Sequence, residues 1–299
     1  MQRFTLEQLA TLLALVSEGS FDAAAARLHV TPSAVSQRVK AMEQTSGRVL
    51  VQRTTPIRLT DAGDVLLRYA RQVELLEADT VRELQDGQLA GDVFLMSLAV
   101  NADSLATWFL TALAGLEESL GVAFDLHRED QEHTTRLLRA GTVMAAVTST
   151  REAVQGCVTE PLGQMRYHAV ATPTFVERWL PADAGLVALP NAPVVTFERN
   201  DDLQESFLRE HAGTGSSGPV HYIPTSNDFV RAILLGFGWG MLPEQQCAEE
   251  IADGRLVDLA PASTVDVPLF WQRWNLSSPL LDAVSAAVRD EALVTLRPF

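Results

Sequence analysis

The stretch from residue 21 to residue 50 constrains the fold more than any other part of this 299-residue chain. It holds four alanines, Ala23 to Ala26, followed by Thr31-Pro32-Ser33-Ala34-Val35-Ser36-Gln37-Arg38 and then Gly47. Alanine is the best helix former and has little bulk, so a first helix can approach a second one closely. Thr31 is a good N-cap and Pro32 suits the first helical position. The stretch therefore predicts two short helices joined by a tight turn.

The second predicted helix has one apolar face and one polar face. Its apolar residues, Ala34, Val35, Val39 and Met42, recur at the spacing of a buried stripe. Hydroxyl and amide groups on the opposite face suit base edges and phosphate oxygens, and basic groups there supply charge. We interpret the pair as a helix-turn-helix with the candidate DNA contacts Ser33, Ser36, Gln37, Arg38 and Lys40. An ordinary two-helix corner with a solvated polar face is the alternative.

The charge distribution supports the DNA-binding interpretation, although the whole chain is acidic. The formal net charge is -15, which by itself suggests a protein that repels nucleic acid. Nearly all of this acidity lies beyond residue 60. Residues 22–60 contain only Asp22 and Glu43 as acids, against the basic residues Arg27, Arg38, Lys40, Arg48, Arg53 and Arg58. The basic footprint of a DNA-binding domain is therefore confined to the start of the chain.

Several motifs in this region resemble the LysR-type transcriptional regulators. They are Leu15-Val16-Ser17-Glu18-Gly19-Ser20-Phe21, Ala24-Ala25-Ala26-Arg27-Leu28-His29-Val30, Ser33 to Lys40 with Glu43 and Gly47, and then Arg53, Leu59-Thr60 and Ala62-Gly63. The resemblance, which extends over the full chain, implies a winged helix-turn-helix at 1–61. It places Arg48, Arg53 and Arg58 in a two-stranded wing as phosphate contacts. It also implies two partners, double-stranded DNA with an inverted-repeat site and RNA polymerase.

A long helix is predicted after Gly63, from about Ala62 to Leu89. Its apolar residues repeat at steps of three and four with charged residues between them, as in a coiled coil about three heptads long. We therefore interpret 62–91 as a dimerisation helix ending in a hinge, with Leu66, Val73, Leu76 and Leu84 in the seam. The alternative is a helix packed on its own domain. The family resemblance implies a homodimer or a homotetramer.

From Val93 onward, short apolar strands alternate with helices. The run Val93 to Val100 suits a strand buried on both faces, and a helix is expected over Leu105 to Leu120. Two such series resemble a periplasmic-binding-protein-like effector domain at 92–299. Lobe I is expected at about 92–165 and 269–299, and lobe II at about 166–268. The fold class predicted for the whole chain is α/β.

Candidate ligand-binding residues lie where strands end, because ligands of such folds bind beyond the carboxyl ends of the strands. The first such turn, Asn101 to Trp108, offers free backbone N–H groups and hydroxyls to a carboxylate. A second polar turn follows at Thr148. Acidic residues, including Glu129, Asp130, Asp201, Asp202 and Asp228, gather at the same level. An acidic cleft favours a cationic ligand, because a buried carboxylate without a partner is costly.

A narrower resemblance concerns the lysine/arginine export regulators within the LysR family. It rests on Asn101-Ala102-Asp103-Ser104-Leu105-Ala106-Thr107-Trp108-Phe109, Glu129-Asp130, Leu137 to Gly141 and Gly238 to Glu244. It implies a small cationic amino acid, L-lysine or L-arginine, as the effector, and the promoter of an amino-acid exporter as the target. The candidate effector contacts are Asn101, Asp103, Ser104, Trp108, Glu129, Asp130, Thr148 and Asp228. A small-molecule-binding or nucleoid-type DNA-binding protein without ligand-controlled transcription is the alternative.

Other functions find little support in the sequence. The glycine-rich segment from Gly236 to Gly240 lies after a predicted helix and before a predicted strand. A dinucleotide-binding loop has the opposite order, because it follows a strand and precedes a helix. His127, Glu129 and His133 are not expected to converge on a metal, and no Gly-x-Ser-x-Gly elbow occurs. We therefore expect no cofactor, no metal and no enzymatic activity.

The expected location is the cytoplasm. Met1 to Ala10 carries Glu7 and no long apolar run, so we expect no signal peptide. No segment approaches the roughly 20 apolar residues of a membrane span, so no membrane partner is expected. Cys157 and Cys247 lie far apart in sequence and suit buried thiols of a reducing compartment.

Overall fold

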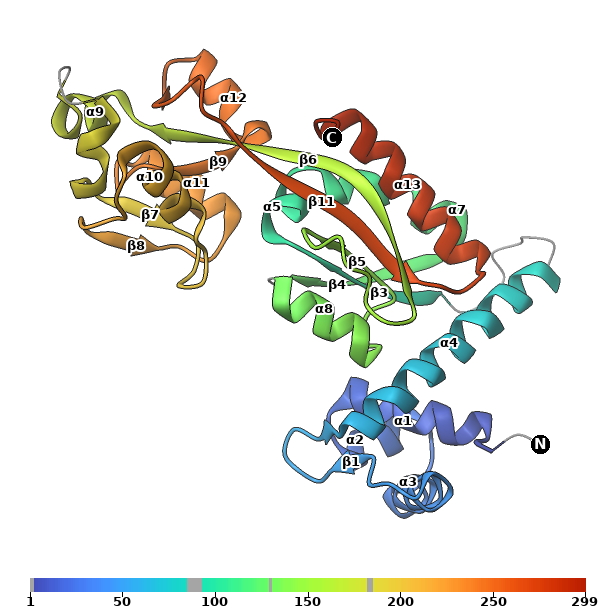
Figure 1. Ribbon diagram of the computed structural model, residues 1–299. Coiled ribbons are helices and arrows are strands. Elements are labelled where there is room, and N and C mark those ends of the chain that lie inside the picture. The colour runs from blue at the N-terminus through green and yellow to red at the C-terminus, as the bar shows by residue number, and fades with distance from the viewer. Residues whose placement is uncertain (1–2, 85–92, 129–130, 182–184) are drawn as a thin grey trace.

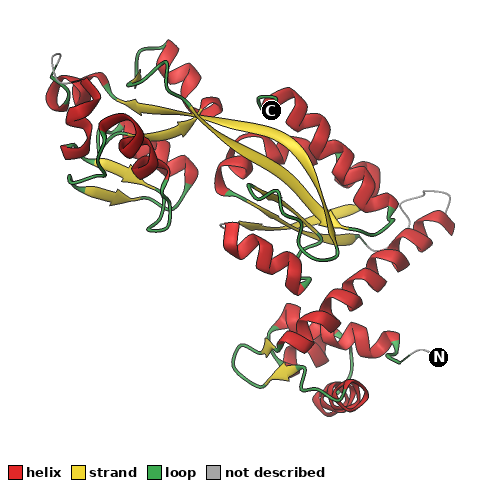
Figure 2. Cartoon of the chain, viewed as in Figure 1, coloured by secondary structure: helices red, strands yellow, loops and turns green. Residues whose placement is uncertain are grey.

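The computed structural model describes residues 3–84, 93–128, 131–181 and 185–299 (Figure 1). A small helical N-terminal domain is joined by one long helix to a C-terminal domain of two α/β lobes (Figure 2). The predicted α/β class and this order of parts are confirmed. Within the described ranges, no helix combines the length and the apolar character needed to cross a bilayer.

The N-terminal domain has the predicted pair of helices and a small hairpin. It comprises α1 (Leu6–Glu18), α2 (Phe21–Arg27), α3 (Pro32–Ser46), β1 (Val51–Gln52) and β2 (Arg58–Leu59). The Thr31 hydroxyl accepts a hydrogen bond from the Ala34 N–H at 3.2 Å, so Thr31 caps α3 as expected. Gly47 ends α3 at a φ of 67°, a left-handed conformation that glycine adopts readily.

The buried stripe of α3 packs against α1 and α2. Val35, Val39 and Met42 are buried as predicted, whereas Ala34 is only partly buried. Ala24 and Ala25 of α2 are also buried, and their small side chains let the helices approach closely. This packing fixes the polar face of α3 toward the outside of the domain.

The long helix α4 (Asp61–Leu84) divides its packing between the two domains. Leu66 and Ala70 belong to the core of the N-terminal domain, and Val73 is partly buried against that core. Leu75 is fully buried in the core of the C-terminal domain. Leu66, and in part Val73, therefore pack within their own chain and not against a second one, as the alternative of a helix packed on its own domain predicts. Of the predicted seam, only Leu76 and Leu84 are exposed, and residues 85–92 lie outside the described ranges.

Polar contacts also fasten α4 to the C-terminal domain. The Arg71 guanidinium donates to the carbonyl oxygen of Thr142, and Asp79 accepts from the Leu280 N–H at 3.1 Å. At Gly141 a Cβ atom would lie 2.4 Å from the Cβ of Arg68 on α4, so this close approach requires glycine. The long helix is thus a packed part of both domains within one chain.

One mixed sheet runs through the C-terminal domain in the order β10-β6-β11-β5-β3-β4, with β9 paired to β6. Its strands are β3 (Phe94–Val100), β4 (Val122–Arg128), β5 (Ala145–Thr148), β6 (Cys157–Ala171), β9 (Gly240–Pro243), β10 (Val257–Asp258) and β11 (Val265–Trp274). β3 is parallel to β4 and β5, as expected of strands joined by helices. The long antiparallel strands β6 and β11 run from one lobe into the other (Figure 1).

The remaining elements, which are helices and the strands β7 and β8, each belong to one of the two lobes. Lobe I carries α5 (Ala102–Ser104), η1 (Leu105–Phe109, a π-helical turn), α6 (Leu110–Leu113), α7 (Leu116–Leu120), α8 (Gln131–Ala140) and α13 (Pro279–Thr295). Lobe II carries α9 (Pro173–Trp179), η2 (Gly185–Asn191, a 3-10 turn), β7 (Val194–Thr196), α10 (Leu203–Ala212), β8 (Val220–Tyr222), α11 (Ser226–Leu234) and α12 (Glu244–Ala252).

The prediction of one continuous helix over Leu105 to Leu120 is wrong. The helical conformation is interrupted at Ala114 and Gly115, where φ of Gly115 is 80°.

Replacing Thr31 by alanine should destabilise α3 by about 1 kcal/mol, because the Ala34 N–H would lose its capping partner. Hydrogen exchange of peptides covering residues 31–46 in the full chain measures the effect, and we expect faster exchange. Thr31→Ser keeps the hydroxyl and should exchange like the wild type. Equal exchange in the alanine and serine variants would show that the cap does not stabilise the helix.

Candidate functional site

The outward face of α3 carries most of the predicted DNA contacts. Ser33, Gln37 and Lys40 are exposed, and Ser36 is partly exposed. Arg38 is turned toward α1, where its guanidinium pairs with Glu7 at 2.9 Å and donates to the Thr11 hydroxyl at 3.3 Å. The face therefore presents hydroxyl, amide and ammonium groups, and Arg38 holds α3 against α1.

The hairpin beside α3 carries the other predicted DNA contacts. Glu43 near the end of α3 accepts from the Leu50 N–H at 2.9 Å, which fixes where the hairpin begins. Arg48, Arg53 and Arg58 are exposed, and the Arg53 guanidinium lies 5.4 Å from the ring centroid of Phe21. Three exposed cations thus lie in the segment that follows α3, where they are available to phosphates.

A second candidate site is a cavity of about 340 Å³ between the two lobes. Its lining includes Asn101 and Arg128 from lobe I, Tyr167 from the crossing strand β6, and Ser226 and Gln246 from lobe II. The carboxylates of Asp103, Glu198 and Asp201 also line it. This volume lies at the small end of the range for ligand pockets, about 300–1,000 Å³, and suits a molecule the size of an amino acid.

Asp103 lines this cavity and joins the two lobes. Its carboxylate accepts one hydrogen bond from the Tyr167 hydroxyl and one from the Ser226 hydroxyl, each at 2.8 Å. Gln246 in turn donates to the Ser226 hydroxyl at 3.0 Å. Burial raises the pKa of Asp103, and the two hydrogen bonds oppose that rise in pKa.

Asp201 supplies a second carboxylate to the lining and is partly buried. It accepts from the backbone N–H groups of Phe197 at 3.2 Å and Leu203 at 3.1 Å. Burial is the largest cause of its raised pKa, and the charge of Asp103 raises that pKa further. The cavity therefore concentrates negative charge.

Arg128 at the end of β4 is the cation in the cavity lining. Its guanidinium donates to the carbonyl oxygen of Pro224 at 2.5 Å and lies 5.8 Å from the ring centroid of Phe197. Both partners belong to lobe II. The Asn101 side-chain oxygen, also in the lining, is buried and has no hydrogen-bond partner among the described residues. The cavity thus combines an acidic part, a guanidinium and an unused acceptor.

The structure brings two of the predicted effector contacts, Asn101 and Asp103, into the cavity lining. Ser104 and Trp108 are buried outside the lining, and Thr148 is buried at the end of β5 with its hydroxyl bonded to the Thr150 carbonyl oxygen. Asp228 is exposed and accepts from the Thr225 hydroxyl at 2.6 Å. Glu129 and Asp130 lie outside the described residues.

Tyr167, Gln246 and Arg128 are lining residues that the sequence did not point to as ligand contacts. Each belongs to a different element, and no local motif connects them. Ser226 lies in a polar turn after a strand, and Asp201 is one of the acids expected at the level of the cleft; both line the cavity. Among the described residues, no group of three or more His, Cys, Asp or Glu side chains is placed to hold a metal.

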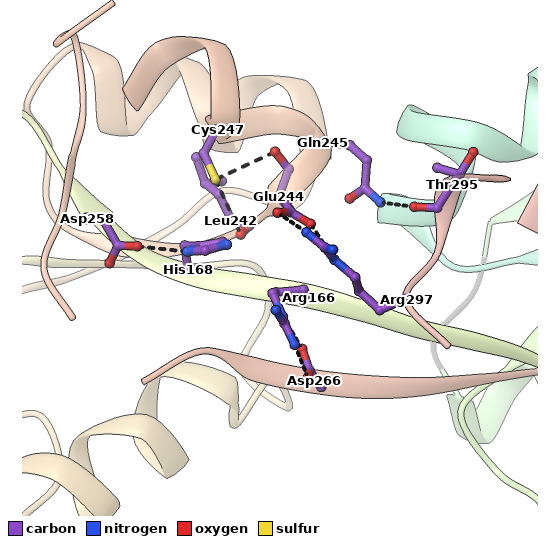
Figure 3. A network of polar contacts seen from close by, with 10 residues as sticks. All are labelled: Arg166, His168, Leu242, Glu244, Gln245, Cys247, Asp258, Asp266, Thr295 and Arg297. Atoms are coloured by element: carbon purple, nitrogen blue, oxygen red, sulfur yellow. Dashed lines mark hydrogen bonds and ion pairs between the residues drawn. The ribbon is translucent and has the colours of Figure 1, made fainter. Parts of the chain in front are cut away.

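Ion pairs lie along the crossing strands and beside α12 (Figure 3). Arg166 on β6 pairs with Asp266 on β11 at 2.8 Å. Glu244 at the start of α12 pairs with Arg297 in the C-terminal segment at 2.6 Å, and this pairing holds the pKa of Glu244 below its usual range. Pro243 and Gln246, which flank this ion pair in sequence, line the cavity. The network therefore connects the cavity wall to the end of the chain.

Comparison with known proteins assigns both domains. A family model described as "Bacterial regulatory helix-turn-helix protein, lysR family" matches residues 6–64. A second, described as "LysR substrate binding domain", matches residues 73–293. Together they cover most of the N-terminal domain, the two ends of the long helix and most of both lobes.

Three similar proteins add detail. The crystal structure of ArgP from Mycobacterium tuberculosis has a TM-score of 0.86 and 45% identity, covering 98% of both chains. The lysine export transcriptional regulatory protein LysG from Corynebacterium glutamicum is 41% identical over 97% of this chain and 99% of its own. A structure of full-length LysG from that organism with bound effector Arg has a TM-score of 0.79 and 40% identity, covering 99% of this chain and 100% of that one.

Proposed function

The chain belongs to the LysR family of bacterial transcriptional regulators, and we propose that its effector is a basic amino acid, L-lysine or L-arginine. The target we propose is the promoter of an amino-acid exporter, as in the lysine export regulator of C. glutamicum. The observation that carries the proposal is the charge pattern of the cavity between the lobes. Asp103 and Asp201 lie in its lining together with Arg128.

This charge pattern suits a zwitterion with an additional cation. Arg128 would pair with the α-carboxylate, because a guanidinium binds a carboxylate through parallel N–H donors. The side-chain cation would then meet Asp103 and Asp201, and the Asn101 oxygen would accept from an ammonium N–H. The arginine bound in the related LysG structure supports a ligand of this class.

The N-terminal domain is proposed to bind an inverted-repeat site in double-stranded DNA through two copies of α3. Ser33, Gln37 and Lys40 are exposed on α3 and accessible to base edges, with Ser36 beside them. Arg48, Arg53 and Arg58 of the hairpin would hold phosphates. We assign Arg38 mainly to positioning α3, because its guanidinium already pairs with Glu7.

Dimerisation is proposed to use the exposed apolar residues of α4. Val65, Tyr69 and Leu76 are exposed at steps of four and seven, which places them on one face of the helix. An apolar hollow beside them, lined in part by Phe4 and Ala62, could receive side chains of a second copy. We propose a homodimer or homotetramer that acts on RNA polymerase in the cytoplasm.

Removing a cavity carboxylate should abolish tight binding of the effector. Isothermal titration of arginine and lysine into the full chain measures affinity, with leucine and glutamate as comparison ligands. Asp103→Asn or Asp201→Asn should weaken arginine binding by about 2–5 kcal/mol, because the enclosed ligand cation would lose its partner. Asp228→Asn, outside the cavity, should bind like the wild type. Tighter binding of leucine or glutamate than of arginine and lysine would refute the basic-amino-acid proposal.

Substitutions in α3 and in the hairpin should have different effects on DNA binding. Gln37→Ala should relax sequence preference, because it removes a group that reaches base edges. Arg53→Ala should weaken specific and non-specific binding alike and reduce the salt slope by about one unit. Binding titrations at several salt concentrations on specific and random DNA test this. If Arg53→Ala altered sequence preference without changing the salt slope, the two roles would be wrongly assigned.

A charge on the exposed face of α4 should break the dimer. Leu76→Glu places a carboxylate in the proposed apolar interface, where its burial without a partner is costly. Sedimentation velocity should then show a smaller species, with the circular dichroism of the chain retained. Leu235→Glu changes another exposed leucine, in lobe II, and serves as the control. An unchanged sedimentation profile for Leu76→Glu would exclude this interface.

A further inference from the structure

We propose that Asp103 and Asp201 together retain one proton in the free protein and release it to solvent when the cationic group of the effector enters the cavity. Effector affinity then rises with pH, so the regulator senses a basic amino acid and acidity at the same site. This inference rests on the proposed function, because it requires a cationic ligand in the cavity.

The first reason is that all polar partners of the two carboxylates are neutral. Asp103 accepts from the hydroxyls of Tyr167 and Ser226, and Asp201 accepts from two backbone N–H groups. Among the described residues, neither carboxylate forms an ion pair. An enclosed carboxylate without a cation either takes up a proton or attracts a cationic ligand.

The second reason is the set of charges that face the pair. Tyr167 on β6 lies between the lobes, and its hydroxyl donates to Asp103. Burial, followed by the charges of Asp103 and Asp201, raises the pKa of Tyr167. Glu198 adds a further negative charge to the lining, Asp202 adds one near Asp201, and α12 contributes the neutral Gln246. Among the described lining residues Arg128 on β4 is the cation, and its partners, the Pro224 carbonyl oxygen and the Phe197 ring, are neutral. Negative charge thus exceeds positive charge around Asp103 and Asp201.

These surroundings determine the direction of the pH effect. Burial raises the pKa of both Asp103 and Asp201, and the charge of Asp103 adds to the rise at Asp201. Two interacting carboxylates lose their protons in separate steps, so the pair keeps one proton to a higher pH than a solvated aspartate does. A bound cation favours the ionised form and lowers the pKa of the pair. Between the two pKa values, binding therefore releases a proton, and affinity increases with pH.

The Tyr167 hydroxyl donates its hydrogen bond to Asp103 both before and after the carboxylate pair loses its proton. Burial is the largest cause of its pKa being well above the usual value, so its hydroxyl stays protonated when the carboxylates ionise. The hydrogen bond from Tyr167 to Asp103 therefore persists in both states. The proton that leaves belongs to the carboxylate pair and passes to the buffer.

Isothermal titration of arginine into the full chain tests the inference. Arginine is the suitable probe because its guanidinium stays charged over the whole range from about pH 5 to about pH 7. Each titration is repeated in two buffers that differ in ionisation enthalpy. For the wild type we expect a binding enthalpy that depends on the buffer, which indicates proton release, and an affinity that rises by up to about tenfold per pH unit.

Asp201→Asn removes one carboxylate, so the remaining one should ionise at lower pH. Its arginine binding should be weaker and nearly independent of pH and of the buffer. Asp228→Asn should behave like the wild type. Infrared difference spectroscopy of the wild type supplies a measurement that needs no variant, because the band of a protonated carboxylic acid should disappear when arginine is added.

Two results separate the failure of this inference from the failure of the proposed function. Arginine binding with a buffer-independent enthalpy, a flat affinity over the same pH range and no loss of the carboxylic acid band would overturn proton release and leave the effector assignment intact. Absence of arginine binding by the wild type at every pH would overturn the proposed function itself.

Discussion

The contact between Asp103 and the two hydroxyls of Tyr167 and Ser226 is the interaction on which the effector domain depends. It joins α5, which follows β3 in lobe I, to the crossing strand β6 and to α11 in lobe II. Among the described lining residues, Asp103, Glu198 and Asp201 outnumber the cation Arg128, and this excess of negative charge suits the proposed cationic effector. Asp103 therefore joins the lobes and contributes to the charge of the proposed effector site.

The helix α4 extends this coupling toward the DNA-binding surface. Leu66 and Ala70 lie in the core of the N-terminal domain, and Leu75 lies in the core of the effector domain. The Arg71 contact to the Thr142 carbonyl oxygen fixes the same helix to the loop that leads into β5. Since packed interfaces resist continuous deformation, a change in the lobes can alter how α4 presents the N-terminal domains to DNA.

Sequence reasoning succeeded where the information is local. The Thr31 cap, the Gly47 stop and the stripe of Val35, Val39 and Met42 are set by neighbours in sequence, and the structure has all three. The alternation of apolar strands and helices likewise indicated two α/β lobes. The packing of Leu66 could not be predicted, because a seam facing a second chain and a face packed in cis have the same spacing.

The cavity was the least predictable part. Asn101 and Asp103 lie in a recognisable turn, but Tyr167, Ser226 and Gln246 converge on Asp103 only through the crossing strands and the closure of the lobes. Ser104 and Trp108 belong to the same turn as Asp103, yet both are buried and lie outside the lining. Spacing along the chain does not show whether a residue of this turn lines the cavity or is buried outside it.

We propose that a ligand in this cavity controls DNA binding. A DNase footprint of the full chain, on a genomic fragment that the protein itself selects, tests this control most directly when recorded with and without arginine. Arginine should change the extent of the footprint for the wild type and leave it unchanged for Asp103→Asn. An identical footprint with and without arginine, for a protein that binds arginine, would contradict ligand control and favour a nucleoid-type DNA-binding protein.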